Sequence, residues 1–131
     1  MTELVVKSIA DLAAYAGPHA IPGIRFRAAR EPLGVTAWGM SVIELDPNTT
    51  AYPEHDHGDD GHEEVYVVLR GSAVLVTDGT TERSVGEGDF VAVPPGVARR
   101  FVTRDHAVTL LALGGTPGKP YAPSFGRRIR R

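Results

Sequence analysis

Apolar positions along this chain recur in short runs in which every second side chain is apolar. In the segment 24–30, for example, Ile24 and Phe26 alternate with Arg25 and Arg27. A period of two is the pattern of a β-strand that buries one of its faces. Turn-forming residues interrupt these runs roughly every 8–12 residues, which is the spacing of sandwiches and barrels. The pattern predicts an all-β fold of short antiparallel strands.

The runs and the turns between them define the expected elements. We expect strands at 3–7, 24–30, 35–45, 49–57, 63–69, 73–77, 83–85, 90–93, 99–103 and 106–113. The clearest turn is Asp78-Gly79, because Asp-Gly between two apolar runs favours a tight β-hairpin. Ser8 is expected to cap a short helix that runs through Tyr15 and stops at Gly17-Pro18.

The chain has 131 residues, which is the size of a single domain. Residues 1–34 are expected to form an N-terminal extension with a strand, a short helix and an edge strand. Residues 35–114 are expected to form the barrel, and residues 115–131 a tail that is rich in Pro and Gly and ends in arginines. The 15 glycines and 10 prolines argue against a helical bundle, because both residues interrupt helices.

Composition and charge exclude several kinds of chemistry. The chain has no cysteine, which excludes disulfides, thiolate metal sites and a cysteine nucleophile. The formal net charge is −2, and acidic residues concentrate in segment 54–64. An acidic body argues against a nucleic-acid partner. No export signal or membrane-spanning run is visible, so we expect a cytoplasmic protein without a membrane partner.

Most of the candidate chemistry lies between residues 52 and 64. His55 and His57 are two residues apart, so on a strand both imidazoles point to one face and can share a metal ion. Glu64 opens the next expected strand and can add a carboxylate. Two histidines and one carboxylate form the facial triad of non-haem iron enzymes. The alternative is an exposed, acidic loop that happens to be rich in histidine.

These residues also stand in a family pattern. His55-x-His57, Glu64, six further residues and then Gly71 resemble the first motif of the cupin family. Gly88, five residues, Pro94-Pro95-Gly96 and two further residues resemble its second motif. The resemblance covers about residues 50–103 and implies a cupin-type jelly-roll barrel. It also implies that the last metal ligand would be a histidine at the end of the second motif.

The chain departs from that pattern at two places. Six residues separate His57 and Glu64, where the family has three or four; we expect the excess to bulge out as a loop. Arg99 stands where the second-motif histidine would be. A guanidinium is a permanent cation with no lone pair to give to a metal. At ~4 Å and an effective dielectric constant of ~20, repulsion between two unit charges costs about 4 kcal/mol.

Two interpretations of the site follow. In the first, His55, His57 and Glu64 hold a divalent ion such as iron, manganese, zinc or nickel, and Arg99 swings aside or clamps an anionic substrate. In the second, the metal site is lost. Arg99 then forms an ion pair with Glu64 inside the barrel or binds the carboxylate of a small ligand.

Other residues are assigned by strand alternation. Tyr66 and Val68 should share the face of Glu64, and Glu63 should face solvent. His62 is an alternative metal ligand if the loop folds inward, and otherwise a solvent-exposed loop residue. Trp38 and Met40 would line the barrel mouth or belong to the core. His19 and His106 are expected at the surface.

Three functions remain open from the sequence. The first is a cupin barrel that binds a small polar or anionic metabolite through Arg99, with Tyr66, Trp38 and Met40 beside it. The second is a metal-dependent oxygenase or isomerase that uses His55, His57 and Glu64. The third is a non-catalytic structural or regulatory module that makes contacts through the acidic loop 54–64 or the arginine tail. The resemblance also implies a homodimer, with the strand near Val5 as the candidate edge.

Overall fold

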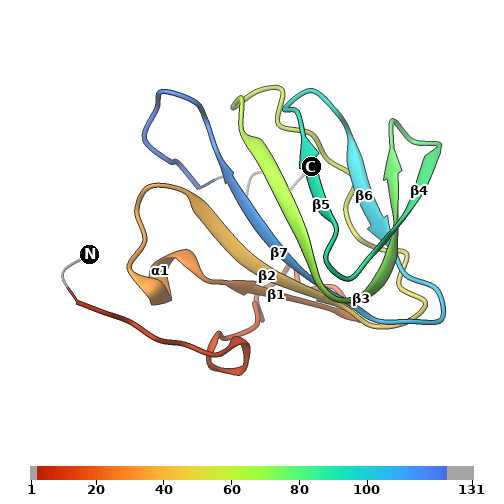
Figure 1. Cartoon of the computed structure of the whole chain (residues 1–131), viewed down its shortest axis with the longest axis horizontal. Helices are drawn as coiled ribbons and strands as arrows, with labels where there is room; N and C mark the ends of the chain where they lie inside the picture. Colours follow the sequence, from red (N-terminus) through yellow and green to blue (C-terminus); the bar gives the residue numbers. More distant parts are fainter. Residues whose placement is uncertain (1–2, 124–131) are drawn as a thin grey trace.

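The computed structural model describes residues 3–123, and most of its regular secondary structure is antiparallel β-strand (Figure 1). The strands are β1 (Ile24–Ala28), β2 (Gly39–Leu45), β3 (Glu63–Thr77), β4 (Thr81–Gly86), β5 (Phe90–Val93), β6 (Arg99–Val102) and β7 (Val108–Gly115). The helical elements are the 3₁₀ turn η1 (Ile9–Asp11) and the single-turn helix α1 (Arg30–Leu33). The predicted all-β class with a short N-terminal helical element is confirmed.

Strand β3 holds the barrel together because four other strands pair with it. The sheet order is β1-β2-β7-β3-β4, and β5 and β6 also pair with β3. The first half of β3 pairs with β7 and β5, and its second half pairs with β4 and β6. The strand therefore bends from one wall of the barrel into the other, as Figure 1 shows.

The predicted break between the segments 63–69 and 73–77 is wrong, because one strand of 15 residues spans both. Gly71 has a φ of +76°, and a Cβ at that position would lie 1.9 Å from the carbonyl oxygen of Ala107. A register shift between β3 and β7 also falls between Val68 and Arg70. Glycine thus lets the strand bend while its neighbour approaches closely, instead of ending it.

The N-terminal prediction is also wrong in detail. Residues 3–7 form no strand; Leu4 is 93 % exposed and Val6 is 83 % exposed. The expected helix from Ser8 to Tyr15 is reduced to η1. Leu12 turns away to pack in a buried apolar cluster, and Ala14 forms an isolated bridge with Arg27. Tertiary contacts have overridden a weak local helix preference.

Two further strand predictions need correction. Residues 49–57 form no regular strand, and within them only His55 makes a β-bridge, to Arg99. Strand β2 begins at Gly39 instead of residue 35, because α1 and the bend that follows it occupy residues 30–38. The expected turn Asp78-Gly79 is confirmed between β3 and β4, and both residues have positive φ.

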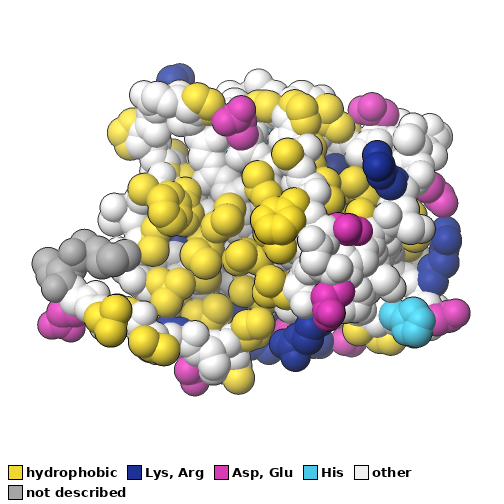
Figure 2. Space-filling model, viewed as in Figure 1, with side chains coloured by type: hydrophobic (Ala, Val, Ile, Leu, Met, Phe, Trp, Pro, Cys, Tyr) yellow, Lys and Arg dark blue, Asp and Glu magenta, His cyan; other side chains and the backbone are white. Residues whose placement is uncertain are grey.

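The main core fills the barrel and comes from the inward positions of the strands. It includes Ile43, Leu45, Tyr66, Val68, Phe101 and Leu110. A second cluster of Leu12, Ala29 and Val42 lies on the other face of the sheet, where η1 and α1 cover it. The rest of that outer face is apolar and open, as the hydrophobic patch in Figure 2 shows. Among residues 3–123, no helix is long and apolar enough to span a membrane.

The bend at Gly71 yields a stability prediction. Gly71→Ala should lower the free energy of unfolding by about 3 kcal/mol or more, because the Cβ meets the Ala107 carbonyl and the backbone is left-handed. Gly79→Ala is the matched control: its φ is +82°, but nothing lies within 4 Å of the added Cβ. It should cost about 1 kcal/mol. Urea unfolding measures both, and equal losses would contradict the role given to the close approach.

Candidate functional site

The predicted chemical residues converge at one end of the barrel from three separate segments. His55 and His57 lie on the irregular segment before β3, and the bridge between His55 and Arg99 ties that segment to β6. The two backbone hydrogen bonds of this bridge measure 3.1 and 2.9 Å. Glu64 and Tyr66 face inward from the start of β3. Alternation therefore places both beside the two imidazoles, while Glu63 is exposed as predicted.

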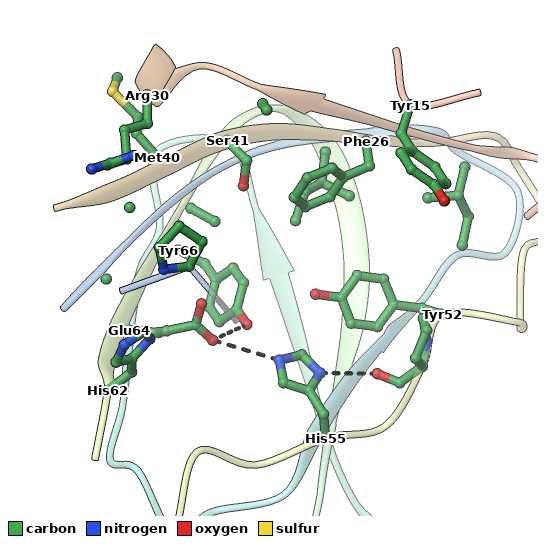
Figure 3. Close-up of a pocket in the computed structure, with 18 of the residues that line it drawn as sticks. Tyr15, Phe26, Arg30, Met40, Ser41, Tyr52, His55, His62, Glu64 and Tyr66 are labelled. Atoms are coloured by element: carbon green, nitrogen blue, oxygen red, sulfur yellow. Dashed lines mark hydrogen bonds and ion pairs between the residues drawn. The ribbon is translucent and has the colours of Figure 1, made fainter. Parts of the chain in front are cut away.

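The carboxylate of Glu64 is the centre of the cluster (Figure 3). Its Oε1 atom lies 3.1 Å from His57 Nε2 and 3.6 Å from His55 Nε2. The Tyr66 hydroxyl donates a hydrogen bond of 2.8 Å to the same oxygen. The predicted proximity of His55, His57 and Glu64 is thus present in the structure, and all three line one cavity.

The Nδ1 atom of each imidazole, on the side of the ring away from Glu64, contacts an oxygen atom that can only accept a hydrogen bond. His55 Nδ1 lies 3.1 Å from the carbonyl oxygen of Pro53, and His57 Nδ1 lies 3.1 Å from Asp60 Oδ1. A neutral imidazole carries a single N–H. If that proton is on Nδ1, the Nε2 lone pair faces the carboxylate of Glu64. A proton or a metal ion between Nε2 and Glu64 removes this repulsion.

The surroundings of Glu64 and Asp60 keep both carboxylates ionised. Burial by itself would raise the pKa of Glu64, but hydrogen bonds from His55, His57 and Tyr66 hold that pKa well below its ordinary value. Burial also opposes ionisation of Asp60, yet the His62 backbone N–H and His57 lower its pKa to about 2. Burial raises the pKa of both Tyr52 and Tyr66, so both phenols stay neutral and can donate hydrogen bonds.

Arg99 lies behind the cluster and does not line the cavity. Its side chain is fully buried, and Nη1 lies 3.8 Å from Glu64 Oε1. The other contacts of the guanidinium are the carbonyl oxygens of His55 and Pro94, at 3.4 and 3.5 Å. The structure therefore brings Arg99 to ion-pair distance of Glu64, and it does not place Arg99 among the residues that line the cavity.

The loop between His57 and Glu64 folds inward instead of bulging out. His62 is only 5 % exposed, so its alternative placement in solvent is wrong. Its ring stacks on that of His57 with centroids 5.2 Å apart and lies 5.4 Å from the ring of Tyr121. His57, Asp60 and His62 form a second group whose ligand atoms lie within 4.8 Å of one another. His57 belongs to both groups.

The cavity has a volume of about 330 Å³ and a largely apolar wall. Phe26, Ile43 and Ala112 contribute to this wall, and the hydroxyl of Ser41 points into the cavity in Figure 3. Met40 lies at the rim and packs against the second cluster, whereas Trp38 is 47 % exposed and is not among the lining residues. His106 is exposed as expected, but His19 lines the cavity.

Sequence reasoning missed Arg30 at the rim. Arg30 is the only arginine or lysine among the described residues that line the cavity. Its guanidinium carbon lies 4.9 Å from the centroid of the Tyr121 ring, and its buried Nε has no hydrogen-bond partner. Nothing near Arg30 in the sequence marks it, because α1 and the C-terminal segment meet there only in the folded chain.

The donor atoms of His55, His57 and Glu64 fit a divalent metal ion. Two ligand atoms that lie about 2.1 Å from an ion and about 90–110° apart are roughly 3.0–3.4 Å from each other. The two Nε2–Oε1 distances are 3.1 and 3.6 Å. The contacts of both Nδ1 atoms are those that orient metal-binding histidines. Arg99 supplies no fourth ligand, and its charge weakens the affinity for a cation.

The antiparallel barrel and the polar cluster at its end define the class of protein. A family model described as the cupin domain matches residues 41–113, which is more than half of the chain. The chain belongs to the cupin family, and the predicted family is confirmed.

Solved structures support the same fold. The polyketide cyclase RemF from Streptomyces resistomycificus is 23 % identical, with a TM-score of 0.72 over 92 % of this chain and 81 % of that one. A cupin-superfamily sugar phosphate isomerase from Silicibacter pomeroyi is 23 % identical, with a TM-score of 0.66 over 82 % of this chain and 73 % of that one. A cupin protein from Bacteroides fragilis is 19 % identical, with a TM-score of 0.64 over 81 % and 88 % of the two chains. A search of curated protein sequences finds no match.

Proposed function

We propose that this cupin binds a small molecule with a largely apolar body, a hydroxyl group at one end and an acidic group at the other. The observation that carries this proposal is the distribution of polar groups around an apolar cavity of about 330 Å³. Pockets for small organic molecules have this composition, in which few polar groups set the orientation.

The inner end of the cavity suits a neutral hydroxyl group. The ionised carboxylate of Glu64 accepts a hydrogen bond, and it would repel an anion placed against it. Tyr52 lies beside this end with its hydroxyl directed toward the cavity (Figure 3). A ligand hydroxyl can donate to Glu64 and accept from a neutral phenol.

The rim of the cavity suits the acidic group of the proposed ligand. Arg30 presents a buried Nε without a hydrogen-bond partner and lies over the ring of Tyr121. A guanidinium binds a carboxylate through two parallel hydrogen bonds, which satisfies such an atom. In this proposal Arg30 binds the anionic group of the ligand, whereas the sequence suggested Arg99 for this role.

A metal-dependent enzyme is the second candidate, and it rests on the two Nε2 atoms that converge on Glu64. His55, His57 and Glu64 would hold the ion. A divalent ion there would polarise an oxygen of the substrate as a Lewis acid. The neighbouring structures include a cyclase, an isomerase and a predicted oxalate decarboxylase, so they favour no single reaction.

Ligand binding is tested with two fluorescent probes, 6-hydroxy-2-naphthoate and 2-naphthol, titrated against the protein. The naphthoate should bind with a dissociation constant below about 1 mM, and Arg30→Met should weaken it about tenfold, the range of one charge-assisted hydrogen bond. The same variant should change 2-naphthol affinity less than twofold. Arg104→Met removes an exposed arginine elsewhere and serves as the control.

Two outcomes would count against the ligand proposal. One is naphthoate affinity that Arg30→Met leaves unchanged. The other is equal binding after Ser41→Leu, because a leucine at this inward position should fill the cavity and exclude both probes, whereas Ser41→Ala should not.

The metal candidate is tested by elemental analysis after loading with iron(II), manganese(II), zinc(II) or nickel(II) and dialysis. Near one ion per chain, lost in His57→Ala, is expected for a three-ligand site. Arg99→His replaces a buried cation by a ligand and should tighten metal binding at least about tenfold. Arg100→His adds a histidine at the next position of β6 and should have no effect. Less than about a tenth of an ion per chain in the wild type would reject the metal candidate.

A further inference from the structure

Residues 116–123 follow β7 and reach the rim of the cavity; we call this segment the strap. The Thr116 hydroxyl donates a hydrogen bond of 2.8 Å to the carbonyl oxygen of Asp60, which fixes the start of the strap to the loop before β3. Further along the strap, Tyr121 and Pro123 are among the residues that line the cavity. The strap therefore forms part of the wall on the side where a ligand would enter.

The ring of Tyr121 lies in a recess formed by three separate elements. The guanidinium carbon of Arg30, from α1, lies 4.9 Å from the centroid of this ring, which is the geometry of a cation–π contact. The ring of His62, from the loop before β3, has its centroid 5.4 Å away, and the two planes are tilted by 32°. Gly39, the first residue of β2, completes the recess.

The glycine at position 39 is explained by the space that the ring occupies. A Cβ added to Gly39 would lie 2.6 Å from both Cε1 and the hydroxyl oxygen of Tyr121. Gly39 is not among the described glycines with positive φ, so the conformational freedom of glycine is not needed there. The start of β2 thus leaves room for an aromatic side chain that is remote in the sequence.

The backbone around Tyr121 is held less firmly than its ring. Within the described residues 3–123, residues 120–123 make no backbone hydrogen bond, and two of these four residues are prolines without an N–H. The last backbone hydrogen bond of the strap closes a turn, in which the Lys119 N–H donates to the carbonyl oxygen of Thr116 at 3.2 Å and Gly118 has a φ of +71°. A segment held mainly by side-chain contacts opens at a low cost in free energy.

We propose that Tyr121 is the gate of the cavity and thereby determines which ligands enter. With its ring in the recess the rim beside Arg30 is covered, and movement of the strap about the turn at Gly118 uncovers it while the barrel stays intact. The closed ring also shields an acidic group bound to Arg30 from water, which strengthens the hydrogen bonds between them. This inference rests on the proposed function, since a gate serves only a cavity that takes up a ligand.

The reaction rate of a thiol inside the cavity tests the gate without any ligand. The chain has no cysteine, so Ser41→Cys introduces a single thiol where the Ser41 hydroxyl points into the cavity (Figure 3). The thiol is treated with a bulky disulfide, 4,4′-dithiodipyridine, and separately with the small methyl methanethiosulfonate. The bulky-to-small ratio of the two rates measures access, because a change in the reactivity of the thiol itself affects both reagents.

Removing the ring should make the thiol accessible to the bulky reagent. In the Ser41→Cys protein, Tyr121→Ala should raise the rate ratio at least about tenfold, because the two ring contacts that favour the closed strap are lost. Tyr121→Phe keeps the ring and should leave the ratio unchanged. Gly39→Ala should also raise the ratio, since the added Cβ displaces the ring. Gly86→Ala is the matched control, because its Cβ meets nothing within 4 Å.

The outcomes separate the gate from the proposed function. A rate ratio that Tyr121→Ala leaves unchanged overturns the gate, and so does a ratio in Tyr121→Phe as high as that in Tyr121→Ala. If Ser41→Cys does not fold, Ala112→Cys supplies the thiol from the same cavity, and the same two results overturn the gate. Failure of the wild type to bind 6-hydroxy-2-naphthoate counts against the proposed function and leaves the measured access to the cavity standing.

Discussion

The site depends above all on the largely buried carboxylate of Glu64, on which groups from three parts of the chain converge. His55 and His57 approach it from the segment before β3, Tyr66 from β3 itself and Arg99 from β6. A carboxylate removed from water is stable only when donors and positive charge surround it. This requirement links the irregular segment 52–62 to the two walls of the barrel.

The replacement of a ligand by Arg99 changes how that carboxylate is satisfied. In the family pattern a fourth metal ligand would occupy this position, whereas here a permanent cation lies 3.8 Å from Glu64. Glu64 is therefore satisfied in part by a fixed positive charge of the protein itself.

The two departures from the family pattern act together. The insertion between His57 and Glu64 brings Asp60 to one nitrogen of His57, while Arg99 alters the electrostatics around the other. The sequence showed both departures but not their consequences. The spacing of His57 and Glu64 gives the length of the loop between them. It does not show whether that polar loop turns outward to water or folds inward onto the His57 ring. Hydrogen bonds from Gly61 and Thr116 decide that question.

By itself the sequence determined the all-β class, the family, the turn at Asp78-Gly79 and the pairing of His55 and His57 with Glu64. These features follow from local periodicity, turn chemistry and motif spacing, which adjacent residues encode. Only the tertiary structure decided that β3 continues through Gly71, that residues 3–7 remain outside the sheet and that Arg30 instead of Arg99 lines the cavity. Those outcomes depend on which distant strand approaches, and long-range contacts override local preference at such points.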